Sequence, residues 1–231
     1  MDPLAGTPWS QPSTVAGFSQ SQPNATLMQF AQAELQRSPT RRAIDLGVGA
    51  ARNAVPLVRQ GWTVLGIDMS RAMLEAAAER VQREGAPARL QLALAPMDAI
   101  PAADRQFDLV IAHGIWNLAR SSAEFRRAVQ EGARVARPGA ALFVFTFSRS
   151  TLPDAAAPVA GEPFVYTQFS GQPQCFLTEQ QLMEELRAAG FVPDPGVPLR
   201  EHNRRTPGML QAPTGPVIYE AAFRFQIPQR Q

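Results

Sequence analysis

Several residue types and patterns are scarce or missing in this sequence of 231 residues. Cys175 is the single cysteine, which excludes a disulfide framework and a metal site built from cysteine pairs. No lysine is present, and the arginines are scattered, so the chain lacks the basic stripe that follows a nucleic-acid backbone. No apolar run approaches the ~20 residues of a membrane-spanning helix. We therefore expect no metal, no nucleic-acid partner and no membrane association.

The first residues, Met1-Asp2-Pro3-Leu4, lack the basic and apolar regions of a secretory signal peptide. The expected location is therefore the cytoplasm. With 45% apolar residues, the chain has enough apolar surface for one large core, and its length fits one α/β domain.

Residues 1–22 are rich in Ser, Gln, Pro, Gly and Thr, which predicts a flexible tail or, alternatively, a flap that covers a ligand with Trp9 and Phe18. Residues 23–231 are expected to form a single domain. Between 148 and 175 the periodicity fails and Pro, Gly and Ala dominate, so we expect a lid-like insertion there.

The remaining segments alternate between strand and helix patterns. Apolar or alternating runs predict six strands, at 43–46, 63–67, 89–94, 107–112, 141–147 and 217–225, with a further short strand within 191–202. Amphipathic spacing and capping residues predict helices at 24–37, 51–60, 70–84, 121–135 and 179–189. This alternation indicates an α/β fold with a largely parallel sheet.

The most informative stretch runs from Arg42 to Asn53 and reads as a strand, a glycine turn and the start of a helix. Gly47 and Gly49 allow a ligand to lie directly against the main chain. Asp68 ends the next strand, about twenty residues later, where a carboxylate binds a ribose in βαβ nucleotide sites.

Two residues distinguish this turn from a dinucleotide site. Arg52 stands where the dinucleotide fingerprint has a glycine, and the carboxylate of Asp45 would repel a pyrophosphate but attract a cationic ligand. The turn alone nevertheless leaves an NAD-dependent oxidoreductase as an alternative.

The pattern Asp-Leu-Gly-x-Gly-x-x-Arg-Asn, residues 45–53, resembles motif I of class I S-adenosylmethionine (SAM) dependent methyltransferases, with Ala51 at the third motif glycine. This resemblance implies a three-layer, doubly wound Rossmann-like fold with a mostly parallel seven-stranded sheet. It also implies SAM as cofactor and S-adenosylhomocysteine as product. A SAM-binding module without catalysis is a further alternative.

The resemblance implies a set of cofactor-binding residues along the carboxyl edge of the sheet. Asp45 is expected to face the methionine end of SAM, Asp68 the ribose and Asp98 the adenine amino group. The full expected set is Asp45, Leu46, Gly47, Gly49, Arg52, Asn53, Asp68, Met69, Met97, Asp98, Ala99 and His113.

The acceptor is expected to be a small molecule bearing a thiol, an oxyanion or a hydroxyl. A neutral acceptor requires a base, and His113 and His202 are the candidate catalytic residues. Trp116, Asn117 and Arg204 are expected to contact the substrate. The segment after His113 lacks the Asn/Asp-Pro-Pro-aromatic motif of enzymes that methylate amide or base nitrogens.

The segment around His202 is similar to the C-terminal part of tellurite-resistance-type methyltransferases, in which a histidine and arginines face an oxyanion. The protein is expected to be a monomer or a homodimer.

Overall fold

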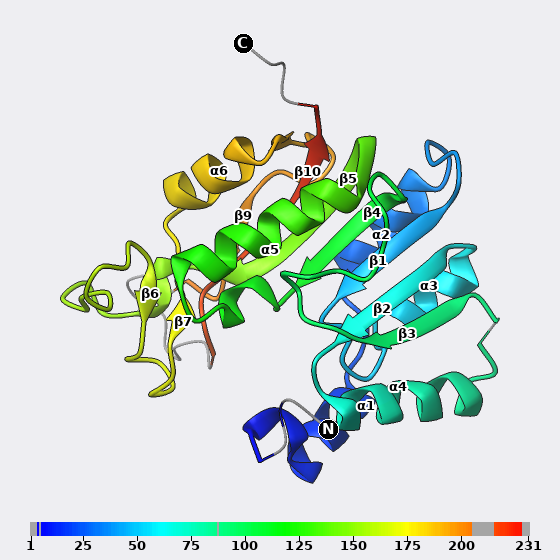
Figure 1. Cartoon of the computed structure of the whole chain (residues 1–231), viewed down its shortest axis with the longest axis horizontal. Helices are drawn as coiled ribbons and strands as arrows, with labels where there is room; N and C mark the ends of the chain where they lie inside the picture. Colours follow the sequence, from blue (N-terminus) through cyan, green and yellow to red (C-terminus); the bar gives the residue numbers. More distant parts are fainter. Residues whose placement is uncertain (1–3, 5, 87, 205–214, 228–231) are drawn as a thin grey trace.

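The computed structural model describes residues 4, 6–86, 88–204 and 215–227. Its main sheet has the strand order β3-β2-β1-β4-β5-β10-β8, with β9 also paired to β10 (Figure 1). The strands are β1 (Arg42–Leu46), β2 (Thr63–Asp68), β3 (Leu90–Leu94), β4 (Phe107–His113), β5 (Ala136–Phe147), β8 (Phe191–Pro193), β9 (Arg200–His202) and β10 (Ile218–Phe225).

The first five strands of this order are parallel, and β10 runs antiparallel to its neighbours. The predicted three-layer, doubly wound, mostly parallel sheet of seven strands is confirmed. One detail differs, because the expected single strand within 191–202 is two short strands. They pair with opposite ends of β10 and share the edge of the sheet.

Helices cover both faces of the sheet. One face packs against α2 (Ala25–Glu34), α3 (Ala54–Gln60) and α4 (Arg71–Arg83), and the other against α5 (Ser122–Val135) and α6 (Glu179–Ala188). Each face buries its own apolar cluster, and burial of apolar side chains is the main stabilising term of such a core.

Local signals set most helix starts. Four helices begin with a side chain that accepts a hydrogen bond from a backbone N–H of the first turn: Asn24 for α2, Ser70 for α4, Ser121 for α5 and Thr178 for α6. Thr178 also forms a capping box with Gln181. The helix expected from 51 begins at Ala54 instead. Ala51 has a φ of 57°, a left-handed conformation that extends the turn and cannot continue a helix.

Two other element boundaries differ from expectation. The strand expected at 141–147 begins earlier, at Ala136, which pairs with Phe107 ahead of a bulge. The helix expected to reach Arg37 ends at Glu34.

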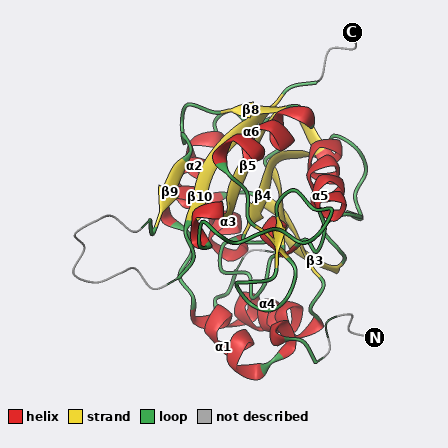
Figure 2. Cartoon of the chain, turned by 90° about the vertical axis from the view of Figure 1, so that its left-hand side faces the viewer, coloured by secondary structure: helices red, strands yellow, loops and turns green. Residues whose placement is uncertain are grey.

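The N-terminal residues contain η1 (Pro8–Ser10) and α1 (Pro12–Gln20), which lie beside α4 (Figure 2). The Ser70 hydroxyl donates to the Trp9 carbonyl at 3.1 Å. The Phe18 ring lies over the glycine turn, since a Cβ on Gly49 would stand 3.7 Å from it. This packing is compatible with the flap alternative, and whether the segment opens and closes stays a prediction.

The insertion at 148–175 contains η3 (Arg149–Thr151) and an antiparallel pair, β6 (Val165–Tyr166) and β7 (Gln174–Cys175). It follows the carboxyl end of β5 (Figure 1). Phe164, Val165 and Cys175 are buried in the main core, so the insertion is anchored to the domain. Its role as a lid stays a prediction.

Candidate active site

The glycine turn and the end of β2 are tied together by main-chain groups. The Gly49 N–H donates to Asp68 Oδ2 at 2.9 Å, and the Ser70 N–H donates to Asp68 Oδ1 at 2.8 Å. Gly47 has a φ of 66°, and a Cβ there would lie 2.7 Å from the Ile115 side chain. Both the backbone angle and the space therefore require glycine at position 47.

Asp45 is the most unusual carboxylate of the site. It is 2% exposed, and its Oδ2 has no hydrogen-bond partner in the described part of the chain. Burial raises the pKa of Asp45 to about 7, although the Arg52 guanidinium opposes this rise. An orphaned, buried acceptor beside bare main chain is suited to an incoming cationic ligand.

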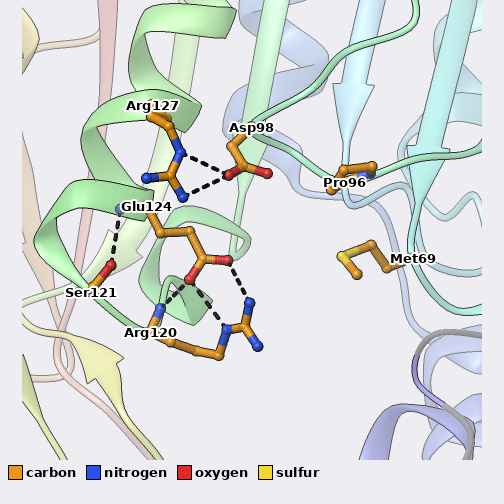
Figure 3. A pocket seen from close by; sticks show the side chains of 7 residues that line it. All are labelled: Met69, Pro96, Asp98, Arg120, Ser121, Glu124 and Arg127. Carbon is orange, nitrogen blue, oxygen red and sulfur yellow. Dashed lines mark hydrogen bonds and ion pairs between the residues drawn. The ribbon is translucent and has the colours of Figure 1, made fainter.

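Asp98 lies on the wall of a pocket of about 400 Å³ (Figure 3). Arg127 of α5 donates through Nε and Nη2 to Asp98 Oδ2, at 3.1 and 3.0 Å. Figure 3 shows the other oxygen turned away from Arg127, toward Pro96 and Met69. The pocket also contains a second ion pair, between Arg120 and Glu124.

His113 ends β4 and is enclosed. Its ring stacks on Phe145 with 4.2 Å between centroids. Nδ1 lies 3.1 Å from Arg52 Nη2, and Nε2 lies 3.2 Å from Asn24 Nδ2. Burial, with the Arg52 charge as a further cause, lowers the pKa of His113 to about 3, so the imidazole is neutral at physiological pH.

Asn24 connects this histidine to a second one. Besides capping α2, its Nδ2 donates to Glu220 Oε1 at 2.8 Å, and its N–H donates to Asn53 Oδ1 at 3.0 Å. Glu220 Oε2 lies 3.3 Å from His202 Nε2. Glu220 is 5% exposed, whereas the His202 side chain is 44% exposed. The two predicted histidines thus belong to one polar network.

The three residues expected to contact the substrate are either buried or paired with a neighbouring side chain. Trp116 is 1% exposed and packs edge-on against Phe125 of α5, and Asn117 is 2% exposed. Arg204 pairs with Glu201 at 3.1 Å. Their contact with substrate stays a prediction.

Of the other residues expected to bind the cofactor, only some lie at the pocket. Met69 lines the pocket with Asp98, whereas Met97 and Leu46 lie in the main core and Ala99 is exposed. The roles assigned to Met97, Leu46 and Ala99 stay predictions.

Sequence reasoning missed three residues that organise the site. The sequence pattern predicts Asn24 only as a helix cap, and Arg127 only as part of a helix. Glu220 had a visible signal, because a carboxylate stands within the apolar run of β10. Buried carboxylates are usually paired, so a partner could have been sought.

A model of the methyltransferase domain family matches residues 44–144. A demethylmenaquinone methyltransferase of Mycolicibacterium vanbaalenii is 31% identical over 173 residues, covering 68% of this chain and 71% of that enzyme. The corresponding enzyme of Corynebacterium glutamicum (strain ATCC 13032) is 27% identical over 191 residues, covering 72% of this chain and 78% of that enzyme.

Among solved structures, the fold is similar to that of a Burkholderia thailandensis 1,6-didemethyltoxoflavin-N1-methyltransferase with bound S-adenosylhomocysteine. The TM-score is 0.62 at 19% identity, covering 87% of this chain and 79% of that chain. The [4+2]-cyclase SpnF also shares the fold, with a TM-score of 0.60 at 22% identity over 77% of this chain and 59% of that chain.

In the described part of the chain, no helix is long and apolar enough to cross a membrane. The family assignment also replaces the two alternatives that the sequence left open, the NAD-dependent oxidoreductase and the SAM-binding module without catalysis. With the strand order, the family model and the sequence relatives in agreement, the chain belongs to the class I SAM-dependent methyltransferases and uses SAM to methylate small molecules.

Proposed function

We propose that this enzyme transfers the methyl group of SAM to a hydroxyl oxygen of a neutral small molecule, with His202 as the general base. This proposal rests on the pair formed by His202 Nε2 and the buried Glu220 carboxylate, which are 3.3 Å apart. Imidazole is the side chain that ordinarily titrates near neutral pH, and a carboxylate on one ring nitrogen leaves the other available to accept a proton.

His113 is less suited to this role. Its pKa of about 3 makes the ring a weak base, and both of its nitrogens already face side-chain donors. We assign it instead to positioning, through its contacts with Arg52 and Asn24. His202 remains the candidate base because nearly half of its side chain is open to an acceptor.

The residues present fit a bound SAM. Asp45, with an orphaned oxygen, would hold the ammonium group, and Arg52 the carboxylate of the methionine end. Asp68 would meet the ribose, and Asp98 and Met69 the adenine within the pocket of Figure 3. Bound SAM would supply an electrophilic methyl carbon and a sulfur leaving group that would keep the electron pair of the carbon–sulfur bond.

The chain's own residues contribute positioning and proton transfer. As the acceptor oxygen gains its new bond, His202 Nδ1 takes the hydroxyl proton, and Glu220 stabilises the resulting imidazolium. Asn24 holds the Glu220 carboxylate in place through the 2.8 Å bond to Oε1. The exposed ring of His202 then releases the proton to solvent.

An anionic acceptor fits these surroundings less well. Glu220 stands behind His202, and Glu201 pairs with Arg204, so carboxylates accompany both candidate cations. These pairs weigh against the oxyanion acceptor that the tellurite-type similarity suggested. The quinone named by the demethylmenaquinone relatives is uncharged, which agrees with a neutral acceptor, but a quinone carries no hydroxyl, so the hydroxyl rests on His202 alone. Whether the enzyme is a monomer or a homodimer stays a prediction.

The test compares hydroxyl, thiol and oxyanion acceptors by measuring S-adenosylhomocysteine release. We expect methylation of hydroxyl compounds, and we expect His202→Ala to lower kcat at least 100-fold without weakening S-adenosylhomocysteine binding. Because the His202 ring is half exposed, added imidazole should restore part of the activity of this variant. Thiol or oxyanion methylation that persists in His202→Ala would overturn the proposal.

A further inference from the structure

Three phenylalanines form an aromatic cluster between β5 and the insertion at 148–175. Phe147 ends β5, and its ring lies 5.4 Å from Phe169 and 5.3 Å from Phe176, centroid to centroid. Phe169 and Phe176 are 5.6 Å apart. Phe176 is fully buried, but Phe169 is 44% exposed. The cluster therefore presents an uncovered aromatic edge.

The sheet register places this cluster close to the proposed base. Phe147 pairs with Ile218, and Ile218 pairs with His202, so the three residues form one row across β5, β10 and β9. Paired residues project from the same face of a sheet. Neighbouring strands are about 4.8 Å apart, so the outer two Cα atoms are separated by about 10 Å. Ile218 stands in the middle of this row, which joins the aromatic cluster to His202.

The base itself restricts the kind of hydroxyl. A phenolic hydroxyl has a pKa of about 10, only a few units above that of an ordinary imidazole, whereas an aliphatic alcohol is a far weaker acid. Proton transfer to imidazole is therefore effective for a phenol and poor for an alcohol. The chemistry of His202 and the aromatic neighbours at Phe147 and Phe169 select the same class of acceptor.

Arg149, the arginine of the insertion, offers little to an anionic substituent. Arg149 stacks over Tyr166 with 5.0 Å to the ring centroid, and its guanidinium donates to the carbonyls of Leu152, Pro153, Asp154 and Ala156. Its hydrogen-bonding capacity is thus used within the insertion. An acidic group on the acceptor would gain no partner from it, which favours an uncharged ring.

We propose that the acceptor is an uncharged aromatic hydroxyl compound, whose ring packs against Phe147 and Phe169 and whose hydroxyl meets His202. This inference rests on the proposed function of hydroxyl methylation and narrows it to phenols. Phe169 is then a specificity-determining residue, and it acts on binding of the ring without taking part in proton transfer.

The experiment compares 2-naphthol, its saturated analogue decahydro-2-naphthol, and 2-naphthalenethiol, each with SAM and the full chain. We expect kcat/KM for 2-naphthol to exceed that for the saturated alcohol at least 100-fold. Phe169→Leu should raise KM for 2-naphthol about 10-fold with little change in kcat, whereas Phe169→Tyr should behave like the wild type. Val159→Ala, at another exposed apolar residue of the insertion, is the matched control.

The outcomes distinguish failure of the aromatic acceptor from failure of hydroxyl methylation. Equal rates with the saturated alcohol, or an unchanged KM in Phe169→Leu, would overturn the aromatic inference while hydroxyl methylation stands. Methylation of the thiol alone would overturn hydroxyl methylation itself, and with it the inference. Failure of all three probes, with S-adenosylhomocysteine binding intact, also counts against the aromatic acceptor.

Discussion

Arg52 Nη2 and His113 Nδ1 lie 3.1 Å apart, while Asn24 Nδ2 approaches the other nitrogen of the same ring. Both approaching groups are donors, because Asn24 Oδ1 already accepts the Leu27 N–H and so fixes the orientation of the amide. A neutral imidazole accepts at only one nitrogen. One of the two donors is therefore left unsatisfied, and Arg52 is the one that an anionic ligand group can recruit.

A first prediction concerns Arg52 and the methionine end of the cofactor. Arg52→Gln should weaken S-adenosylhomocysteine binding about 10- to 100-fold, the scale of a charge-assisted hydrogen bond. It should leave 5′-methylthioadenosine binding unchanged, because that ligand lacks the amino-acid group. Calorimetry measures both. Arg59→Gln is the control, since Arg59 pairs with Glu84 away from the turn, and an equal loss for both ligands would refute the assignment.

A second prediction follows from two opposed titrations. The pKa of Asp45 is about 7 in the folded protein against 3.8 ordinarily, so the folded state holds an extra proton between these values. The free energy of unfolding therefore falls as pH rises through this window. The pKa of His113 is about 3 against 6.5, so the unfolded state holds the extra proton, and the free energy of unfolding rises with pH.

These slopes cancel between about pH 4 and 6.5. Asp45→Asn should leave the His113 contribution alone, so its stability should rise with pH by up to about 1.4 kcal/mol per unit relative to the wild type. His113→Asn should show the opposite trend. Urea unfolding without cofactor at several pH values measures both. Curves parallel to that of the wild type would show that these groups do not titrate as described.

A third prediction concerns adenine recognition by the Asp98–Arg127 pair. Arg127→Gln should weaken S-adenosylhomocysteine binding about 10-fold, because it frees the Asp98 carboxylate to rotate. S-inosylhomocysteine, which has a carbonyl in place of the adenine amino group, should be insensitive to the substitution. Arg126→Gln is a close control, since the neighbouring Arg126 pairs with Glu185 outside the pocket. The same loss with both ligands would show that Arg127 acts on the fold alone.

A fourth prediction tests the glycine turn. Gly47→Ala should destabilise the protein by about 1–3 kcal/mol and abolish cofactor binding, because its φ is positive and a Cβ would collide with Ile115. Gly17→Ala in α1 should be neutral or slightly stabilising, because open space surrounds that position and its backbone is helical. Thermal melts and calorimetry decide, and a Gly47→Ala variant with unchanged stability and cofactor binding would contradict the described backbone.

The fold could be predicted where local chemistry determines it. Ser70, Ser121 and Thr178 cap the helices that their sequence positions predict, and the apolar β4 run occupies the centre of the sheet. The start of α3 could not be predicted, because an alanine in the left-handed conformation carries no sequence signal. The pairing of β8 and β9 with one strand depends on tertiary packing.

In the candidate site too, features set by local sequence could be predicted and long-range contacts could not. The closeness of Asp68 to the glycine turn could be predicted, because Asp68 ends the strand that follows the turn, at the spacing typical of a βαβ unit. The contact between Asn24 and Glu220 joins residues 196 positions apart, and no short pattern encodes such a distance. Arg127 was missed for a similar reason, since its partner Asp98 lies across a strand and a loop.

The position of Asn24 has a consequence for shortened forms of the protein. This one residue caps α2 and also contacts Asn53 just before α3, His113 of β4 and Glu220 of β10. A chain starting at Pro23 would keep every one of these bonds, whereas a chain starting at Ala25 would lose a helix cap and both histidine supports together. Two deletions that differ by two residues should therefore give one form that keeps the polar network around His202 and one whose Glu220 has lost the amide that holds it behind His202.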